Sequence, residues 1–218
     1  MDIKNALDFF EQLAQNNNRE WFNARKDTYL KIKGEAENFA DALIAEISQF
    51  YNLFGLQGKD CIFRIYRDIR FSADKRPYKD HIGIYIARGG KKSRLAGYYI
   101  HLKSGECMLA GGVWCPEKYD LEQIRRVIFN DPNSYKKILD EKSFSKKFSL
   151  WEQKLKTLPK GFPKDTPEQT AEFIKYTAFV PMKYYTDEEI CSKNFFEQLI
   201  NDIKIMQPYN DFINNIIE

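Results

Sequence analysis

Hydrophobic residues recur along the chain with two different periods, and the change of period separates helical from extended regions. Up to about residue 50 they recur every three to four positions, which predicts helices over 3–14 and over 17–50. Asn17, followed three residues later by Glu20, has the spacing of a helix N-cap with its capping box. Between residues 61 and 113 apolar and polar residues alternate instead, which is the period of β-strands.

Four strands are expected in the alternating region. They cover 63–71, 82–86, 95–102 and a stretch after the turn at Ser104-Gly105, and a two-residue turn at Gly89-Gly90 joins the second strand to the third. Both faces of this sheet are apolar, so helices must cover it. The expected fold class is therefore α+β, an antiparallel β-meander covered by N-terminal and C-terminal helices, in a single domain over 1–218.

Beyond residue 114 the helical period returns. We expect a helix opened by Pro116, a turn at 131–134 followed by a short helix, and C-terminal helices interrupted at Pro208. The stretch 157–168, which holds three prolines, is typical of a surface loop.

Positive charge is concentrated in one part of the chain. The formal net charge is only +3, but residues 61–104 hold eleven Lys or Arg against three Asp or Glu. A uniformly basic surface that coats nucleic acid is therefore not indicated. Either a basic site lies in this region, or its turns carry surface lysines.

The four cysteines show no CxxC spacing, and the chain has only two histidines. This composition argues against a zinc site and favours reduced cysteines in the core. The sequence starts without a signal-like segment, and no apolar run approaches membrane-spanning length. We therefore expect a cytoplasmic protein without a membrane partner.

The candidate site is the stretch Arg64–His81, which contains four arginines, two lysines and three aspartates. On an extended strand, alternate residues share one face about 6.6 Å apart. The shared face of strand 63–71 carries Arg64, Tyr66, Asp68 and Arg70. Two interpretations remain open: the array binds a phosphate or carboxylate, or it is a self-contained ladder of ion pairs. Arg67 lies on the opposite face and needs a carboxylate, carbonyls or a bulge there.

The loop after this strand presents Lys75, Tyr78 and Lys79, which suits phosphate binding as well as a solvated turn. Asp68 and His81 are the candidate acid/base residues if the protein is an enzyme, and His101 is expected to be a core histidine. A magnesium site is disfavoured because cations surround the aspartates. No motif identifies a cofactor.

Several segments together resemble a known family. They are Asn16–Phe22, Arg64–Lys79, Gly97–Tyr99, Gly111–Trp114 and Leu158–Gly161. Their residues are similar to those of the DUF2461 family of uncharacterised proteins. The resemblance spans nearly the whole chain. It implies a single α+β domain, mostly bacterial and intracellular, and supplies no activity. It also implies that Asn17, Arg19 and Trp21 lie near Arg64–Lys79.

The leading functional hypothesis is a basic pocket for a phosphorylated or carboxylated small molecule. The anion ligands would be Arg64, Arg67, Arg70, Lys75 and Lys79, with a hydroxyl from Tyr78. One alternative is nucleic-acid binding by the basic meander, in which tyrosines at positions 85, 98 and 99 stack on bases. Another is a structural or partner-binding domain whose charged segment is an internal ion-pair network.

Overall fold

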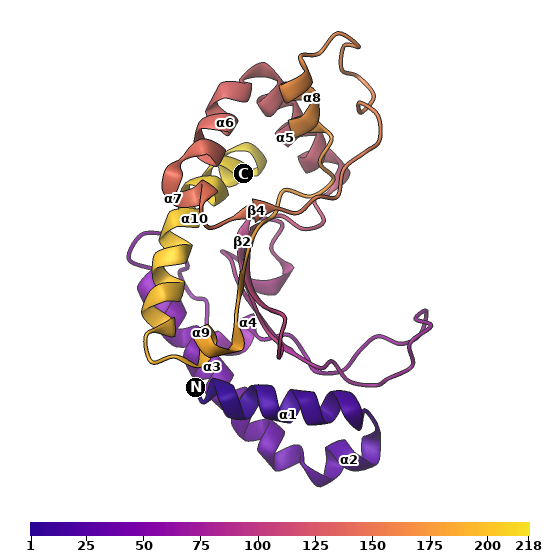
Figure 1. Ribbon diagram of the computed structural model, residues 1–218, viewed down its shortest axis with the longest axis vertical. Helices are drawn as coiled ribbons and strands as arrows, with labels where there is room; N and C mark the ends of the chain where they lie inside the picture. The colour runs from indigo at the N-terminus through magenta and orange to yellow at the C-terminus, as the bar shows by residue number, and fades with distance from the viewer. The chain divides into compact units, whose positions relative to one another are not determined.

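A computed structural model describes residues 1–218 (Figure 1). Its helices are α1 (Ile3–Gln15), α2 (Arg19–Ala24), α3 (Lys26–Ile47), α4 (Gly58–Cys61), α5 (Lys118–Asn130), α6 (Pro132–Asp140), α7 (Lys142–Ser145), α8 (Glu168–Ile174), α9 (Asp187–Cys191) and α10 (Phe195–Ile217), with a 3₁₀ turn η1 (Gly90–Lys92). Its strands are β1 (Ile82–Ile86), β2 (Gly97–Leu102), β3 (Cys107–Gly112), β4 (Ser149–Leu150) and β5 (Pro181–Tyr185).

The strands form one five-stranded antiparallel sheet in the order β1-β2-β3-β5-β4. Consecutive strands β1, β2 and β3 are neighbours, which is the expected meander, and Ser149 of β4 lies opposite Met182 of β5. Gly105 takes the positive φ of the turn between β2 and β3. The predicted α+β class is confirmed.

The chain divides into two compact units. Unit 1 consists of 1–92, 99–109 and 184–200, and unit 2 of 93–98, 110–183 and 201–218. Whether 1–218 folds as a single domain stays a prediction.

Unit 1 is built on its N-terminal helices. One face of α1 is buried, and the sequence predicted this face from its period. α3 packs against α1, α4 and β1. The core of the unit includes Phe10, Leu13, Ile32, Leu43 and Ile84.

In unit 2 the C-terminal part of α10 is joined to the sheet by two buried asparagines. The Asn210 amide donates to the Gly97 carbonyl at 3.0 Å, and its oxygen accepts from the Gly112 N–H at 2.8 Å. The Asn214 oxygen accepts from the Ala96 N–H at 2.7 Å, and its amide donates to the Ala96 carbonyl at 3.2 Å. These bonds satisfy buried backbone groups of Ala96, Gly97 and Gly112.

This interaction explains one wrong prediction. Gly89 and Gly90 have the positive φ values of 87° and 72° that a tight turn requires. However, the turn continues into η1, and β2 begins at Gly97 rather than at residue 95. The backbone of Ala96 is bonded to α10, so it does not extend the strand.

The predicted strand 63–71 is also wrong. Within this segment only Tyr66 makes a β-bridge, an isolated one to Tyr78, and Ile62 just before it bridges Ile84. Phe71, which the alternation placed on an apolar face, is 95% exposed. Inclusion in the sheet would desolvate charged side chains on both faces, and that cost exceeds the gain from burying a few apolar ones.

Three smaller expectations need correction. The side chain that caps α2 is Asn18 rather than Asn17. α10 runs through Pro208, an exposed position, because buried residues before and after it hold both halves of the helix in place. Cys61 and Cys107 are buried as expected, whereas Cys115 and Cys191 are exposed, and all four are free.

The glycine pair at the end of β3 is explained by packing within unit 2. A Cβ on Gly111 would lie 2.1 Å from the Met206 sulfur, and one on Gly112 would lie 1.8 Å from the Phe179 carbonyl oxygen. Met206 and Phe179 of the same chain therefore occupy the space beside the backbone of Gly111 and Gly112.

We predict that Gly112→Ala destabilises the protein by at least about 3 kcal/mol, since it adds a clash with backbone to an unfavourable left-handed φ. Gly105→Ala is the matched control: it has the same sign of φ, and nothing lies within 4 Å of the new Cβ. It should cost only about 1–2 kcal/mol. Urea unfolding of both variants measures the difference, and equal costs would contradict this account.

Candidate functional site

The segment 64–81 of unit 1 is a loop attached at its base. The Asn17 amide donates to the Tyr78 carbonyl at 3.0 Å, and the Tyr78 N–H donates to the Asn17 side-chain oxygen at 3.1 Å. The Tyr78 ring is buried and stacks on Phe22 with centroids 4.2 Å apart. Beyond the bridge between Tyr66 and Tyr78 the loop projects away from the helices of its unit (Figure 1).

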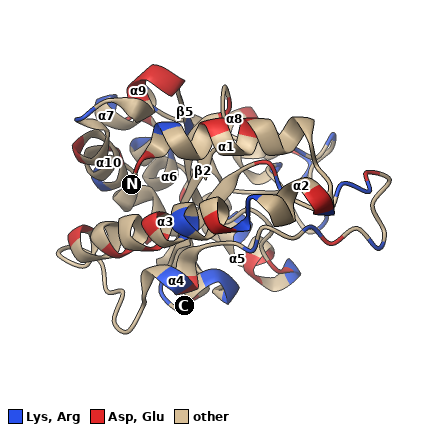
Figure 2. Ribbon diagram, turned by 90° about the horizontal axis from the view of Figure 1, so that it is seen from below, with Lys and Arg blue, Asp and Glu red and all other residues tan.

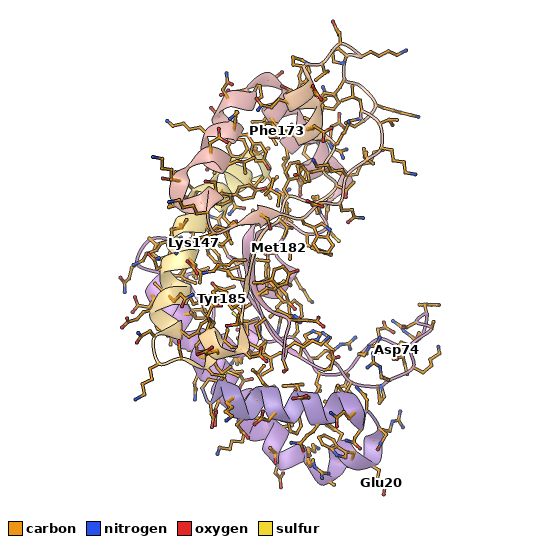
Figure 3. All side chains as sticks on the ribbon, in the orientation of Figure 1. Glu20, Asp74, Lys147, Phe173, Met182 and Tyr185 are labelled. Carbon is orange, nitrogen blue, oxygen red and sulfur yellow. The ribbon has the colours of Figure 1, made fainter.

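Most charged groups of the loop pair with each other. Asp74 accepts hydrogen bonds from Arg67 at 2.5 Å and from Arg76 at 2.7 Å. Arg70 donates to both oxygens of Asp68, at 2.9 and 2.7 Å. Figure 2 shows positive and negative positions alternating along this loop, and Figure 3 labels Asp74 on it. These bonds hold the pKa of Asp68 below its usual value, mainly through the Arg70 guanidinium.

The predicted anion ligands therefore differ in whether a carboxylate of the chain already neutralises their charge. Arg67 and Arg70 are paired with carboxylates, and the Lys75 ammonium donates to the Ile69 carbonyl at 3.0 Å. Arg64 is exposed and has no carboxylate partner. The Lys79 ammonium lies over the Phe63 ring, 5.2 Å from its centroid, and likewise lacks a carboxylate.

The two histidines of the chain lie against each other. The rings of His81 and His101 have centroids 4.3 Å apart. His81 Nδ1 is 3.2 Å from an oxygen of Asp80, and His101 Nδ1 is 2.9 Å from the Tyr99 hydroxyl. His101 was expected only as a core residue; it is half-buried and faces His81. One indication of this pair was present in the sequence, because His81 and His101 are the only two histidines among 218 residues.

Charged side chains surround the histidine pair. Burial is the main cause that lowers the pKa of His81, and the positive charges of Lys79 and Lys103 add to it, while Asp80 opposes it. Burial, His81 and Lys103 lower the pKa of His101 to about 4. Both imidazoles are therefore neutral at pH 7, and neutral imidazole is the form that accepts a proton.

Gly83 in β1 allows the aromatic rings of this cluster to approach. A Cβ there would lie 2.9 Å from the Tyr99 hydroxyl and 3.1 Å from Phe63. Phe63 and Tyr99 form an edge-on pair with centroids 6.1 Å apart. We call Phe63, Lys79–His81, Tyr99, His101 and Lys103 the histidine cluster.

The family resemblance implies that Asn17, Arg19 and Trp21 lie near Arg64–Lys79, and the structure places them at different distances from it. Asn17 is bonded to Tyr78, and the charge of Arg19 acts on the Tyr78 hydroxyl. Trp21 instead packs on Phe9 and beneath Arg25. It therefore contributes to the packing of α1 and α2.

No set of three His, Cys, Asp or Glu side chains is arranged to hold a metal ion. A groove of about 600 Å³ in unit 1 lies elsewhere, between the start of α1, α3, α9 and the start of α10, and no residue of the histidine cluster lines it. No helix has the length and apolar character needed to span a membrane.

Comparison with protein families gives a match over residues 5–212 to a family described as a conserved hypothetical protein, DUF2461. The chain belongs to the DUF2461 family. No similar protein was found among curated proteins or solved structures. The resemblance seen in the sequence is thus confirmed, and the DUF2461 description carries no activity, substrate or cofactor with it.

We predict that Asn17→Ala lowers the free energy of unfolding by about 1–3 kcal/mol, because it leaves the part-buried N–H and carbonyl of Tyr78 without partners. Asn16→Ala, which removes one exposed bond to the Gln12 carbonyl, is the control and should cost much less. The measurement is urea unfolding. Equal costs would show that the anchor contributes nothing specific.

The histidines predict a pH dependence of stability. Their folded pKa values lie below the unfolded value of about 6.5, so the unfolded chain binds more protons between that pH and the folded values. The free energy of unfolding should therefore fall as the pH drops from about 6.5 to about 4. His101→Gln should flatten this dependence. An unchanged slope in the variant, or a His101 pKa near 6.5 by NMR, would contradict the prediction.

Proposed function

We propose that this DUF2461 protein binds a small phosphorylated or carboxylated molecule at the histidine cluster. The observation that supports the proposal is the environment of Lys79. Partial burial and the charge of Arg64 lower its pKa, and no carboxylate of the chain compensates for its charge. An anionic ligand would supply the missing negative charge. Its binding would be strengthened because it stabilises the part-buried ammonium of Lys79.

Lys103 supplies a second positive charge in the cluster. Its ammonium is 2.9 Å from Glu106 and 3.6 Å from Asp80, so carboxylates already hold it in place. Arg64, which is exposed and has no carboxylate partner, adds a third positive charge that acts on Lys79. This position for an anion differs from the charged loop, whose arginines are already paired.

If the bound molecule reacts, His81 is the proposed acid/base residue. Hydrogen bonding to His81 and the charge of Lys103 keep the pKa of Asp80 low in spite of burial, so its carboxylate accepts the Nδ1 proton of His81. The His81 Nε2 is then left as the basic atom. Asp68 suits this role less, because Arg70 holds it as a carboxylate of low pKa on an exposed loop.

The two alternative hypotheses receive different support. The ion pairs of Arg67, Asp74 and Arg76 favour a structural role for the loop charges. Nucleic-acid binding by tyrosines of the meander is disfavoured, because Tyr98 is only 1% exposed, and Tyr85 and Tyr99 are half-buried.

NMR of the two histidine side chains tests the proposal, with His101→Gln used to assign them. Sulfate is the first probe, since it does not titrate in this range, followed by phosphate esters and small carboxylates. A bound anion should raise the His81 pKa, and sulfate should bind more tightly as the pH falls through that pKa.

Lys79→Gln should weaken this binding by about tenfold, which corresponds to the loss of one charge-assisted hydrogen bond. Lys193→Gln, an exposed lysine that lies outside the cluster, is the matched control and should bind like the parent protein. The proposal fails if no anion changes the His81 signal, or if both variants lose binding equally.

A further inference from the structure

The tip of the loop 64–79 carries an aromatic ring that the fold leaves uncovered. Phe71 is 95% exposed, and its neighbour Arg70 is 76% exposed at the side chain. Tyr66, nearer the base of the same loop, is 52% exposed. A side chain of this apolar area in full contact with water has an unfavourable hydration free energy that a partner would remove.

The loop holds this ring in a defined arrangement. The Arg67–Asp74 ion pair and the bond from Lys75 to the Ile69 carbonyl join the two limbs of the loop. Arg70 and Arg76 bond carboxylates two residues away, which fixes the backbone locally. An element that is ordered before binding loses less conformational entropy when it binds.

The loop is also basic after its internal pairs are counted. Residues 64–79 contain six Lys or Arg and two Asp. Four of the six are arginines, whose guanidinium groups bind phosphate through the N–H groups at their edge and stack on a flat ring with their face. The partner must therefore be anionic and must also offer an apolar surface to Phe71.

We propose that the tip of this loop, around Phe71, binds single-stranded nucleic acid. Phe71 would stack on a base, and the N–H groups of Arg67, Arg70 and Arg76 that do not bond carboxylates would contact the flanking phosphates. A single strand offers base faces and separate phosphates, which match one exposed ring between guanidinium groups. An anionic bilayer fits less well, because Phe71 is followed by Ser72 and Ala73 and gives little apolar area to insert. The flat bilayer surface would also place Asp68 and Asp74 against negative charge.

Lys79 at the end of the loop belongs to the histidine cluster, but Phe71 and Arg70, the residues tested here, do not. The chain offers a matched control for the ring, because Phe54 is 99% exposed in the uncharged stretch 51–57 of the same unit. It also offers one for the charge, since Lys59 is exposed on α4. All four side chains are at the surface, so none of these substitutions should disturb folding.

The experiment is fluorescence anisotropy of a short labelled oligothymidylate at low salt, with circular dichroism to check that each variant is folded. Phe71→Ser should weaken binding about tenfold, the factor for loss of one base–aromatic stack, whereas Phe54→Ser should leave it unchanged. Arg70→Gln should lower the slope of log affinity against log salt by about 0.7, and Lys59→Gln should not. A duplex of the same length should bind more weakly.

Three results would overturn the proposal. The parent protein does not bind the oligonucleotide at low salt, or Phe71→Ser and Phe54→Ser bind it equally well. In the third, the protein binds phosphatidylserine vesicles through Phe71 and does not bind the oligonucleotide, which assigns the tip to a membrane surface instead.

Discussion

The attachment of the loop 64–81 depends on one side-chain amide. Asn17 satisfies both backbone groups of Tyr78, a residue 61 positions away, and thereby fixes where the loop leaves the N-terminal helices. The buried rings of Tyr78 and Phe22 stack beside these bonds and shield them from water. Residues 79–81 follow directly, so the position of Lys79 and His81 is set by the same contact. An amide is well suited to this position, since it donates and accepts at once without a charge that would need a partner.

The charged loop and the histidine cluster differ in how their charges are compensated. In the loop, carboxylates lie within reach of arginines, and pairing satisfies both signs locally. In the cluster, Lys79 has no carboxylate partner, and burial shifts the pKa values of the imidazoles and of Lys79 downward. Charge that remains uncompensated in a part-buried place marks a candidate site more specifically than charge density along the sequence.

The sequence predicted those parts of the fold whose pattern is local. The amphipathic α1 and the strand of alternate isoleucines at 82–86 were both found from spacing. The strand 63–71 was wrong because alternation does not show whether a partner strand exists or what desolvation would cost. The start of β2 depends on Asn214, which is 118 residues from Ala96, and no local pattern contains that contact. The meeting of His81 with His101 likewise requires the register of two strands. The functional roles given to the site residues stay predictions.

The two units are interleaved along the chain, which has a consequence for dividing the protein. The chain passes from one unit to the other five times, at boundaries that fall at the end of η1 and within β2, β3, β5 and α10. No single cut of the polypeptide therefore releases either unit, and each cut within α10 would also divide one continuous helix. Any fragment made to isolate the histidine cluster would lose segments of its own unit. A recombination event that exchanges one continuous segment of the gene therefore cannot transfer a complete unit. Each unit is inherited only together with the whole chain.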